Sequence, residues 1–198
     1  QKGYYPNALG KANQDSYLVL ENLMDDSNAH LFGVFDGHGE TGDYCSYYAA
    51  ESFSMCLAKE LRAAGGTKAM DSNNMNKIYT QAFLKSNKSL KTSSIDDSLS
   101  GTTAISVFLK GDKLYVGNVG DSRAIIASVD DKGKLKYSPL SSDQTPFRKD
   151  ERERLKLRGA QIFTIDQIDG HEPIHENWGN DLGETGDEID DAACDPPR

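Results

Sequence analysis

The segment with the clearest chemical potential is Phe35-Asp36-Gly37-His38-Gly39, which completes the short apolar run 30–35. A strand over that run would carry the Asp36 carboxylate to its end, and the two glycines would let the backbone approach a ligand closely. The Asp36 carboxylate and the Gly37 carbonyl are oxygen donors that suit Mg²⁺ or Mn²⁺. His38 is placed to give a proton to a leaving group. A capped turn with a surface histidine explains the pentapeptide equally well, so other residues must decide.

A second carboxylate, Asp15, stands in Asn13-Gln14-Asp15-Ser16, just before an alternating apolar pattern over 16–21. Residues 24–28 form a polar turn between the two apolar runs, and the whole predicts a β-hairpin. In that hairpin Asp15 and Asp36 lie at the outer ends of the paired strands and face each other. Two carboxylates so placed repel unless a cation lies between them, so the pairing favours a metal site.

Two further polar segments border predicted strands. Asp121 lies at a strand break in Asn118-Val119-Gly120-Asp121-Ser122-Arg123, and Thr103 lies in Ser100-Gly101-Thr102-Thr103-Ala104, which opens the preceding strand. Each segment alone is typical of a surface turn.

Two competing catalytic motifs are rejected on physical grounds. His171-Glu172-Pro173-Ile174-His175 fits the HExxH zinc pattern, but that pattern needs a helix and Pro173 would break it. Cys56 precedes Arg62 by six residues, as in cysteine phosphatases. That chemistry needs a glycine-rich loop around the thiolate, whereas this segment has a helical pattern without glycine.

Hydrophobic periods define the elements that must position these residues. Helical periods predict helices over 43–62 and 74–91, and a charged helix over 149–157 that ends at Gly159. Alternation predicts hairpins that pair 103–109 with 113–117 and 123–128 with 134–138, and a last strand over 161–165. Hairpin-linked strands with grouped helices indicate an α+β fold with antiparallel sheets in a single domain.

Charge and cysteine content restrict the class of partner. The net charge is −9, but eleven acidic residues and one arginine fall in 166–198, so the acidity is local. A basic face is missing, which argues against a nucleic-acid partner. No apolar run is long enough for a transmembrane helix, so no membrane partner is expected. Three widely spaced cysteines fit a reducing intracellular compartment, cytoplasmic or nuclear.

Taken together, five stretches resemble the type 2C (PPM) metal-dependent Ser/Thr protein phosphatases, and the match runs along essentially the whole chain. They are the segments around Asp15, Asp36, Thr103 and Asp121 and a fifth, Asp143-Gln144-Thr145-Pro146. Each is modest alone, but all five in family order at suitable spacing are specific. Further short stretches look closest to the plant and protist branch: Tyr4-Tyr5-Pro6, Asp166-Gln167-Ile168 and Asp195-Pro196-Pro197-Arg198.

The resemblance implies an αββα sandwich, two antiparallel sheets flanked by helix pairs, spanning residues 1–198 as the N-terminal two-thirds of the domain. It also implies hydrolysis of phosphoserine and phosphothreonine in a phosphoprotein substrate by water that two Mg²⁺ or Mn²⁺ ions activate. Residues 166–198 would be an acidic, flexible flap-like segment. Some members of the branch are fused to cyclic-nucleotide-binding and protein-kinase regions, so such a region is a candidate fusion partner or regulator.

The resemblance also assigns roles to residues. Asp36 would bridge the two metals, the Gly37 carbonyl would bind one of them, and Asp15 would hold a metal or its water. His38 would be the general acid. Asp121 would lie in the outer shell as a candidate ligand of a third, weaker ion. Thr103 would support the ligands from the outer shell.

Departures from the family pattern keep a second hypothesis open, a catalytically weak or inactive phosphatase fold used for regulation or binding. Gly10 stands where the family usually has a phosphate-binding arginine, and Lys11 and Lys2 are the candidate substitute cations. Gln14, beside the metal ligands, stands where many members have glutamate. The resemblance implies two further metal-binding aspartates, which would lie after Arg198.

Overall fold

The computed structural model describes residues 12–67 and 72–175, which form two compact units divided between Ser141 and Ser142. Within the described ranges, no helix combines the length and the apolar character that crossing a bilayer requires.

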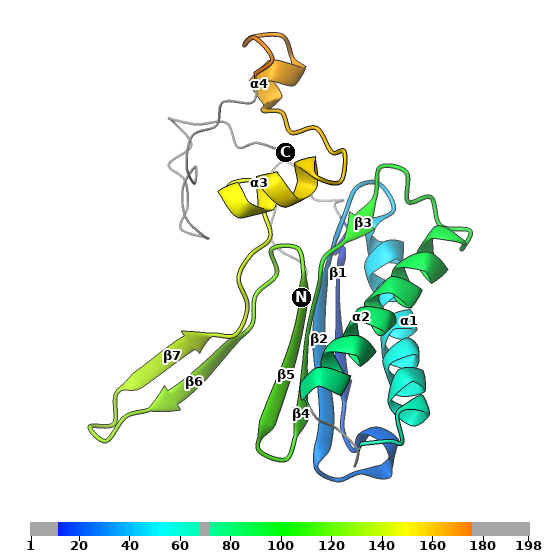
Figure 1. The fold of residues 1–198 in the computed structure, drawn as a ribbon, viewed down its shortest axis with the longest axis vertical. Coiled ribbons are helices and arrows are strands. Elements are labelled where there is room, and N and C mark those ends of the chain that lie inside the picture. The colour runs from blue at the N-terminus through cyan, green and yellow to red at the C-terminus, as the bar shows by residue number, and fades with distance from the viewer. Residues whose placement is uncertain (1–11, 68–71, 176–198) are drawn as a thin grey trace. The chain divides into compact units, whose positions relative to one another are not determined.

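The first unit is built on an antiparallel sheet with the strand order β1-β2-β4-β5, and a short strand, β3, pairs with the end of β2 (Figure 1). The turn between β1 and β2 contains a 3-10 helix, η1 (Leu23–Asp25), and the strands β4 and β5 turn directly at Gly111. The strands are β1 (Asp15–Leu20), β2 (Ala29–His38), β3 (Gly101–Thr102), β4 (Ala104–Lys110) and β5 (Lys113–Val119).

Two helices, α1 (Gly42–Ala63) and α2 (Ser72–Lys91), pack together on one face of this sheet (Figure 1). Alternation along β2 turns Leu31 and Phe35 toward the helices, where they join Phe53, Leu57 and other apolar side chains in the core. Both helices were predicted from the sequence and are confirmed. Cys56 is partly buried in α1, as the rejection of a cysteine-phosphatase loop requires, and its thiol is free.

The opposite face of the sheet is apolar over much of its length. Asp15 at the start of β1 and Asp36 near the end of β2 lie at one edge of this face. Tyr17 is 80% exposed, and Val19, Phe32 and Val34 are also exposed. A sandwich fold buries such a face against a second sheet. The described residues also form a separate two-stranded antiparallel sheet, the hairpin of β6 (Ile125–Val129) and β7 (Leu135–Pro139), and every residue of these two strands is exposed. The α+β class with antiparallel sheets and helices is therefore confirmed.

Strand β2 is longer than the sequence predicted. It continues past Phe35 through Asp36, Gly37 and His38, because the last two residues pair with Thr102 and Gly101 of β3. The segment with the clearest chemical potential therefore lies in a sheet, and its side chains alternate between the two faces.

The second unit contains α3 (Lys149–Lys156), which confirms the predicted charged helix, and the one-turn helix α4 (Ile165–Ile168). The predicted strand over 161–165 is wrong, because residues 161–164 form no strand and α4 begins at Ile165. The Thr164 side chain accepts a hydrogen bond from the Gln167 N–H, and the Gln167 side chain accepts one from the Thr164 N–H. This capping box starts a helix where alternation alone suggested a strand. The HExxH segment follows α4 outside any helix, so it lacks the geometry of a zinc site.

Candidate active site

The two carboxylates that the sequence paired do face each other. Asp15 and Asp36 are direct partners in the β1–β2 register, and alternation puts both on the exposed face of the sheet. Such partners have Cα atoms about 4.5–5.5 Å apart. Partial burial raises the pKa of Asp36, and repulsion from Asp15 raises it further. Two acids that disfavour each other's charge form a place where a cation is stabilised.

A third carboxylate, that of Asp121, influences Asp36. Asp121 follows β5, and its negative charge also raises the pKa of Asp36. Gly120, with a φ of +99°, lets the chain turn here, and a Cβ on it would lie 2.8 Å from the Thr103 methyl carbon. The close approach of Gly120 to Thr103 therefore brings Asp121 toward the strand that carries Asp36.

Thr103 holds the backbone of Asp36 on both sides. The Asp36 N–H donates to Thr103 Oγ1 at 3.0 Å, and the Thr103 N–H donates to the Asp36 carbonyl at 2.9 Å. Thr103 Oγ1 is also 2.6 Å from Ser122 Oγ, next to Asp121. The prediction that Thr103 supports the ligands remains a proposal, and these hydrogen bonds are the contacts through which Thr103 would hold Asp36 in place.

Gly37 is required by the packing around it. A Cβ on this residue would lie 2.1 Å from the Gly42 carbonyl oxygen and 2.5 Å from that of Gln14, both backbone atoms. The Gly37 N–H donates to the Gln14 carbonyl at 3.1 Å. The start of β1, the end of β2 and the first turn of α1 therefore meet at Gly37. Its carbonyl directly follows Asp36 in the chain and remains a candidate ligand.

Gln14 connects backbone segments around the carboxylates. Its side-chain nitrogen donates to the Gly39 carbonyl at 2.6 Å, and its own carbonyl accepts from Ser46 Oγ at 2.5 Å. A glutamate here could not donate the bond to Gly39. The departure from the family pattern thus has a structural use. Ser46, which is fully buried in α1, is a positioning residue that the helical period concealed as part of the core.

His38 ends β2 two residues after Asp36 and therefore shares its exposed face. The imidazole lies over Gly101, because a Cβ there would come within 3.1 Å of His38 Nε2. His38 also affects the nearest acid, since its positive charge lowers the pKa of Asp36 against the larger raising effects. The side chain is exposed and open to a substrate.

The carboxylates fit a divalent cation by chemistry but do not complete a ligand set. They are hard oxygen donors on one face, as Mg²⁺ and Mn²⁺ prefer. Within residues 12–67 and 72–175, however, no three His, Cys, Asp or Glu side chains are grouped closely enough to hold a metal ion. Lys11, the candidate phosphate-binding residue, lies outside the described residues, as does most of the acidic segment 166–198.

Comparisons with known proteins identify the family. The family model "Protein phosphatase 2C" matches residues 8–171, and the chain belongs to this family. It is 45% identical over 199 residues to probable protein phosphatase 2C 35 of Arabidopsis thaliana, covering all of this chain and 52% of that protein. It is 32% identical over 189 residues to probable protein phosphatase 2C 73 of the same plant, covering 88% of this chain and 50% of that protein. The predicted resemblance is therefore confirmed, and the chain spans about half the length of these relatives.

Solved structures agree on the fold. A serine-threonine phosphatase 2C from Toxoplasma gondii superposes with a TM-score of 0.60 at 19% identity, covering 80% of this chain and 54% of that one. A C. elegans sex determining protein superposes with a TM-score of 0.61 at 20% identity, covering 78% of this chain and 37% of that one. The α+β fold with antiparallel sheets and helices, which the family resemblance implied, is thus the fold that this chain shares with them.

Proposed function

We propose that this chain carries part of the active site of a metal-dependent protein serine/threonine phosphatase. The observation that carries the proposal is the pair of opposed carboxylates, Asp15 and Asp36, on the exposed end of the sheet beside His38. Membership of the phosphatase 2C family supports the same reaction, hydrolysis of phosphoserine and phosphothreonine in phosphoproteins.

Asp15 and Asp36 would hold the divalent cations, with the Gly37 carbonyl as a further ligand and Asp121 as a candidate ligand for a third, weaker ion. We propose two principal ions, Mg²⁺ or Mn²⁺. When bound, they would supply Lewis-acid activation of water and stabilise charge on the phosphate. Asp15 and Asp36 alone repel, so the cations would also relieve the repulsion between them.

His38 would act on the leaving group. In the hydrolysis, the phosphorus–oxygen bond to the serine or threonine side chain breaks and a water oxygen replaces it. The departing oxygen needs a proton, which the exposed His38 imidazole can donate from the same face that carries Asp36. Thr103 and Gln14 would hold the backbone around Asp36 and Gly37, which keeps ligands and acid in register.

Phosphate release from a phosphothreonine peptide tests the proposal in the complete protein that carries this chain. Mn²⁺ and Mg²⁺ are each titrated, and wild type is compared with Asp36→Asn and with the control Asp112→Asn, a turn residue away from the site. We expect metal-dependent turnover that Asp36→Asn abolishes and Asp112→Asn preserves. Absence of both turnover and metal binding in wild type would refute the proposal and favour a regulatory or binding role for the fold.

A further inference from the structure

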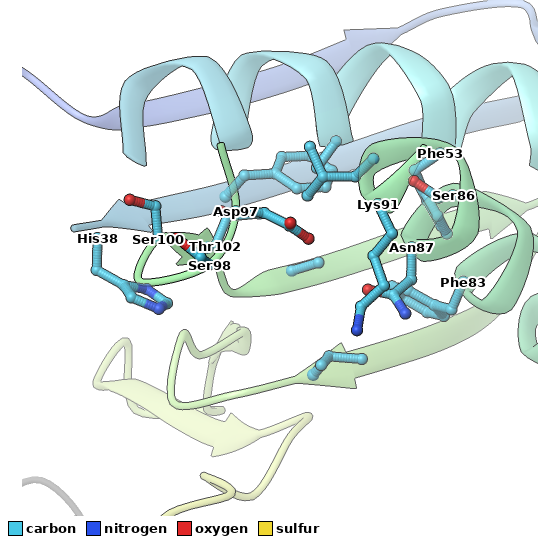
Figure 2. Close-up of a pocket in the computed structure, with 16 residues that line it drawn as sticks. His38, Phe53, Phe83, Ser86, Asn87, Lys91, Asp97, Ser98, Ser100 and Thr102 are labelled. Atoms are coloured by element: carbon cyan, nitrogen blue, oxygen red, sulfur yellow. The ribbon is translucent and has the colours of Figure 1, made fainter. Parts of the chain in front are cut away.

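A pocket of about 510 Å³ opens between His38 at the end of β2 and the C-terminal half of α2. Its size is within the range of about 300–1,000 Å³ that is common for ligand sites. Figure 2 shows His38 at one end and Phe83, Asn87 and Lys91 at the other, with Asp97 between them. The pocket therefore leads away from the residue that we propose to protonate the leaving group.

One end of the pocket is formed by α2. Residues of α2 from Phe83 to Lys91 contribute to its wall, and this stretch of helix spans about 12 Å. An extended peptide advances about 3.3 Å per residue, so three or four residues of a ligand can lie along this stretch of helix.

The lining combines an apolar base with charged groups near the surface. Phe53 and Phe83 lie with ring centroids 4.6 Å apart at the base, and Val119 of β5, which is 46% exposed, also lines the pocket. Lys91 and Asp97 form no ion pair with any residue in the part of the chain that the structure describes. A ligand that covers this pocket can thus bury an apolar group and pair with a cation at its far end.

We propose that this pocket holds three or four residues of the phosphoprotein substrate next to the phosphorylated side chain, with an acidic side chain at Lys91. The occupant is a peptide because the pocket is continuous with His38, where the phosphorylated residue must lie, and because the stretch of α2 that lines its other end suits a short extended segment. An apolar substrate side chain covers Phe83 and Val119, and the Asp97 carboxylate accepts a hydrogen bond from the peptide backbone. The inference rests on the proposed phosphatase function.

Charge reversal at Lys91 tests the inference in the complete protein. One series of phosphothreonine peptides carries Glu or Lys three or four residues before the phosphorylated residue, and a second series carries Glu or Lys three or four residues after it. In one of the two series, wild type should prefer the Glu peptide to the Lys peptide by about threefold in kcat/KM. Lys91→Glu should reverse that preference to a similar extent, as expected for a partly exposed charge pair. Lys88→Glu makes the same change on the exposed side of α2 without lining the pocket, and it should leave the preference as in wild type.

Two readouts separate this inference from the proposed function. Para-nitrophenyl phosphate has no flanking residues that the pocket could bind. Its hydrolysis by wild type therefore reports the phosphatase reaction alone. Fluorescence anisotropy with the same labelled peptides reports binding without turnover. The pocket inference alone would be overturned if wild type hydrolyses para-nitrophenyl phosphate in a metal-dependent way but does not prefer the Glu peptides to the Lys peptides. A preference that Lys91→Glu leaves unchanged would overturn it as well. Failure to hydrolyse any of these substrates would overturn both.

Discussion

Thr103→Val tests how the fold positions the candidate ligand Asp36. The substitution keeps the branched shape of the side chain but removes the oxygen that accepts the Asp36 N–H at 3.0 Å and lies 2.6 Å from Ser122 Oγ. Two polar groups then lose the same partner. Because Val has the same branching as Thr, the backbone around the site can stay extended, and the effect reports the lost hydrogen bonds.

The expected magnitude follows from those two bonds. A hydrogen bond contributes about 0.5–1.5 kcal/mol net, and a buried donor without a partner costs about 1–3 kcal/mol. Since Thr103 is partly exposed, water replaces some of what is lost, and we expect the free energy of unfolding to fall by about 1–2 kcal/mol. Loss of a group that orients a ligand typically weakens metal affinity about 10–100-fold, and we expect the lower end of that range for Mn²⁺.

Urea unfolding and calorimetric titration with Mn²⁺ measure the two effects in the complete protein. Thr103→Ser restores the hydroxyl and should recover most of the Mn²⁺ affinity, which a purely structural loss would not predict. Thr80→Val is the matched control, because Thr80 is exposed and its hydroxyl donates to the Asn76 carbonyl of its own helix, away from Asp36 in the chain. If Thr103→Val binds Mn²⁺ as tightly as wild type, Thr103 does not position a ligand.

Three further substitutions probe the packing and electrostatics of the first unit. Gly37→Ala should lower the free energy of unfolding by about 3 kcal/mol in urea, because the new Cβ would lie 2.1 Å from a backbone oxygen. Asp15→Asn should stabilise the metal-free protein by up to about 1 kcal/mol in urea, by removing repulsion at Asp36, while calorimetry shows weaker Mn²⁺ binding. Hydrogen bonds, first from Lys110, hold the pKa of Asp26 well below its usual value. Its stabilising effect is therefore present above its unfolded-state pKa and declines as pH falls, so the advantage over Asp26→Asn should shrink below about pH 5.

Each of these predictions has an outcome that contradicts it. Gly33→Ala is the control for Gly37→Ala, because a Cβ there would lie 3.0 Å from the Phe35 ring and 3.4 Å from the nearest backbone oxygen, and equal losses would show that the 2.1 Å backbone clash is not decisive. A metal-free Asp15→Asn protein less stable than wild type would contradict the repulsion. A constant stability difference for Asp26→Asn across the acid range would contradict the lowered pKa.

The sequence predicted those parts of the fold that depend on neighbours along the chain. Helices α1 and α2 follow from a period that places Phe53 and Leu57 on one buried face. The pairing of Asp15 with Asp36 was predictable because a hairpin fixes which residues are opposite once its turn is located. The family was identifiable from motifs that recur in order.

The sequence alone did not predict the contacts that complete the site. Strand β2 reaches His38 only because β3, some sixty residues later in the chain, supplies its hydrogen-bond partners. A local capping box outweighed the strand pattern before Ile165.

By itself, the sequence determined which residue types could perform the chemistry and which strands would carry Asp15 and Asp36. Only the tertiary structure decided that Thr103 holds Asp36, that Gln14 and Ser46 join β1 to α1, and that a pocket extends from His38 to Lys91. The physical reason is that periodicity records the face on which a side chain lies. Hydrogen bonds and cavities depend on which distant segments the packed core brings together.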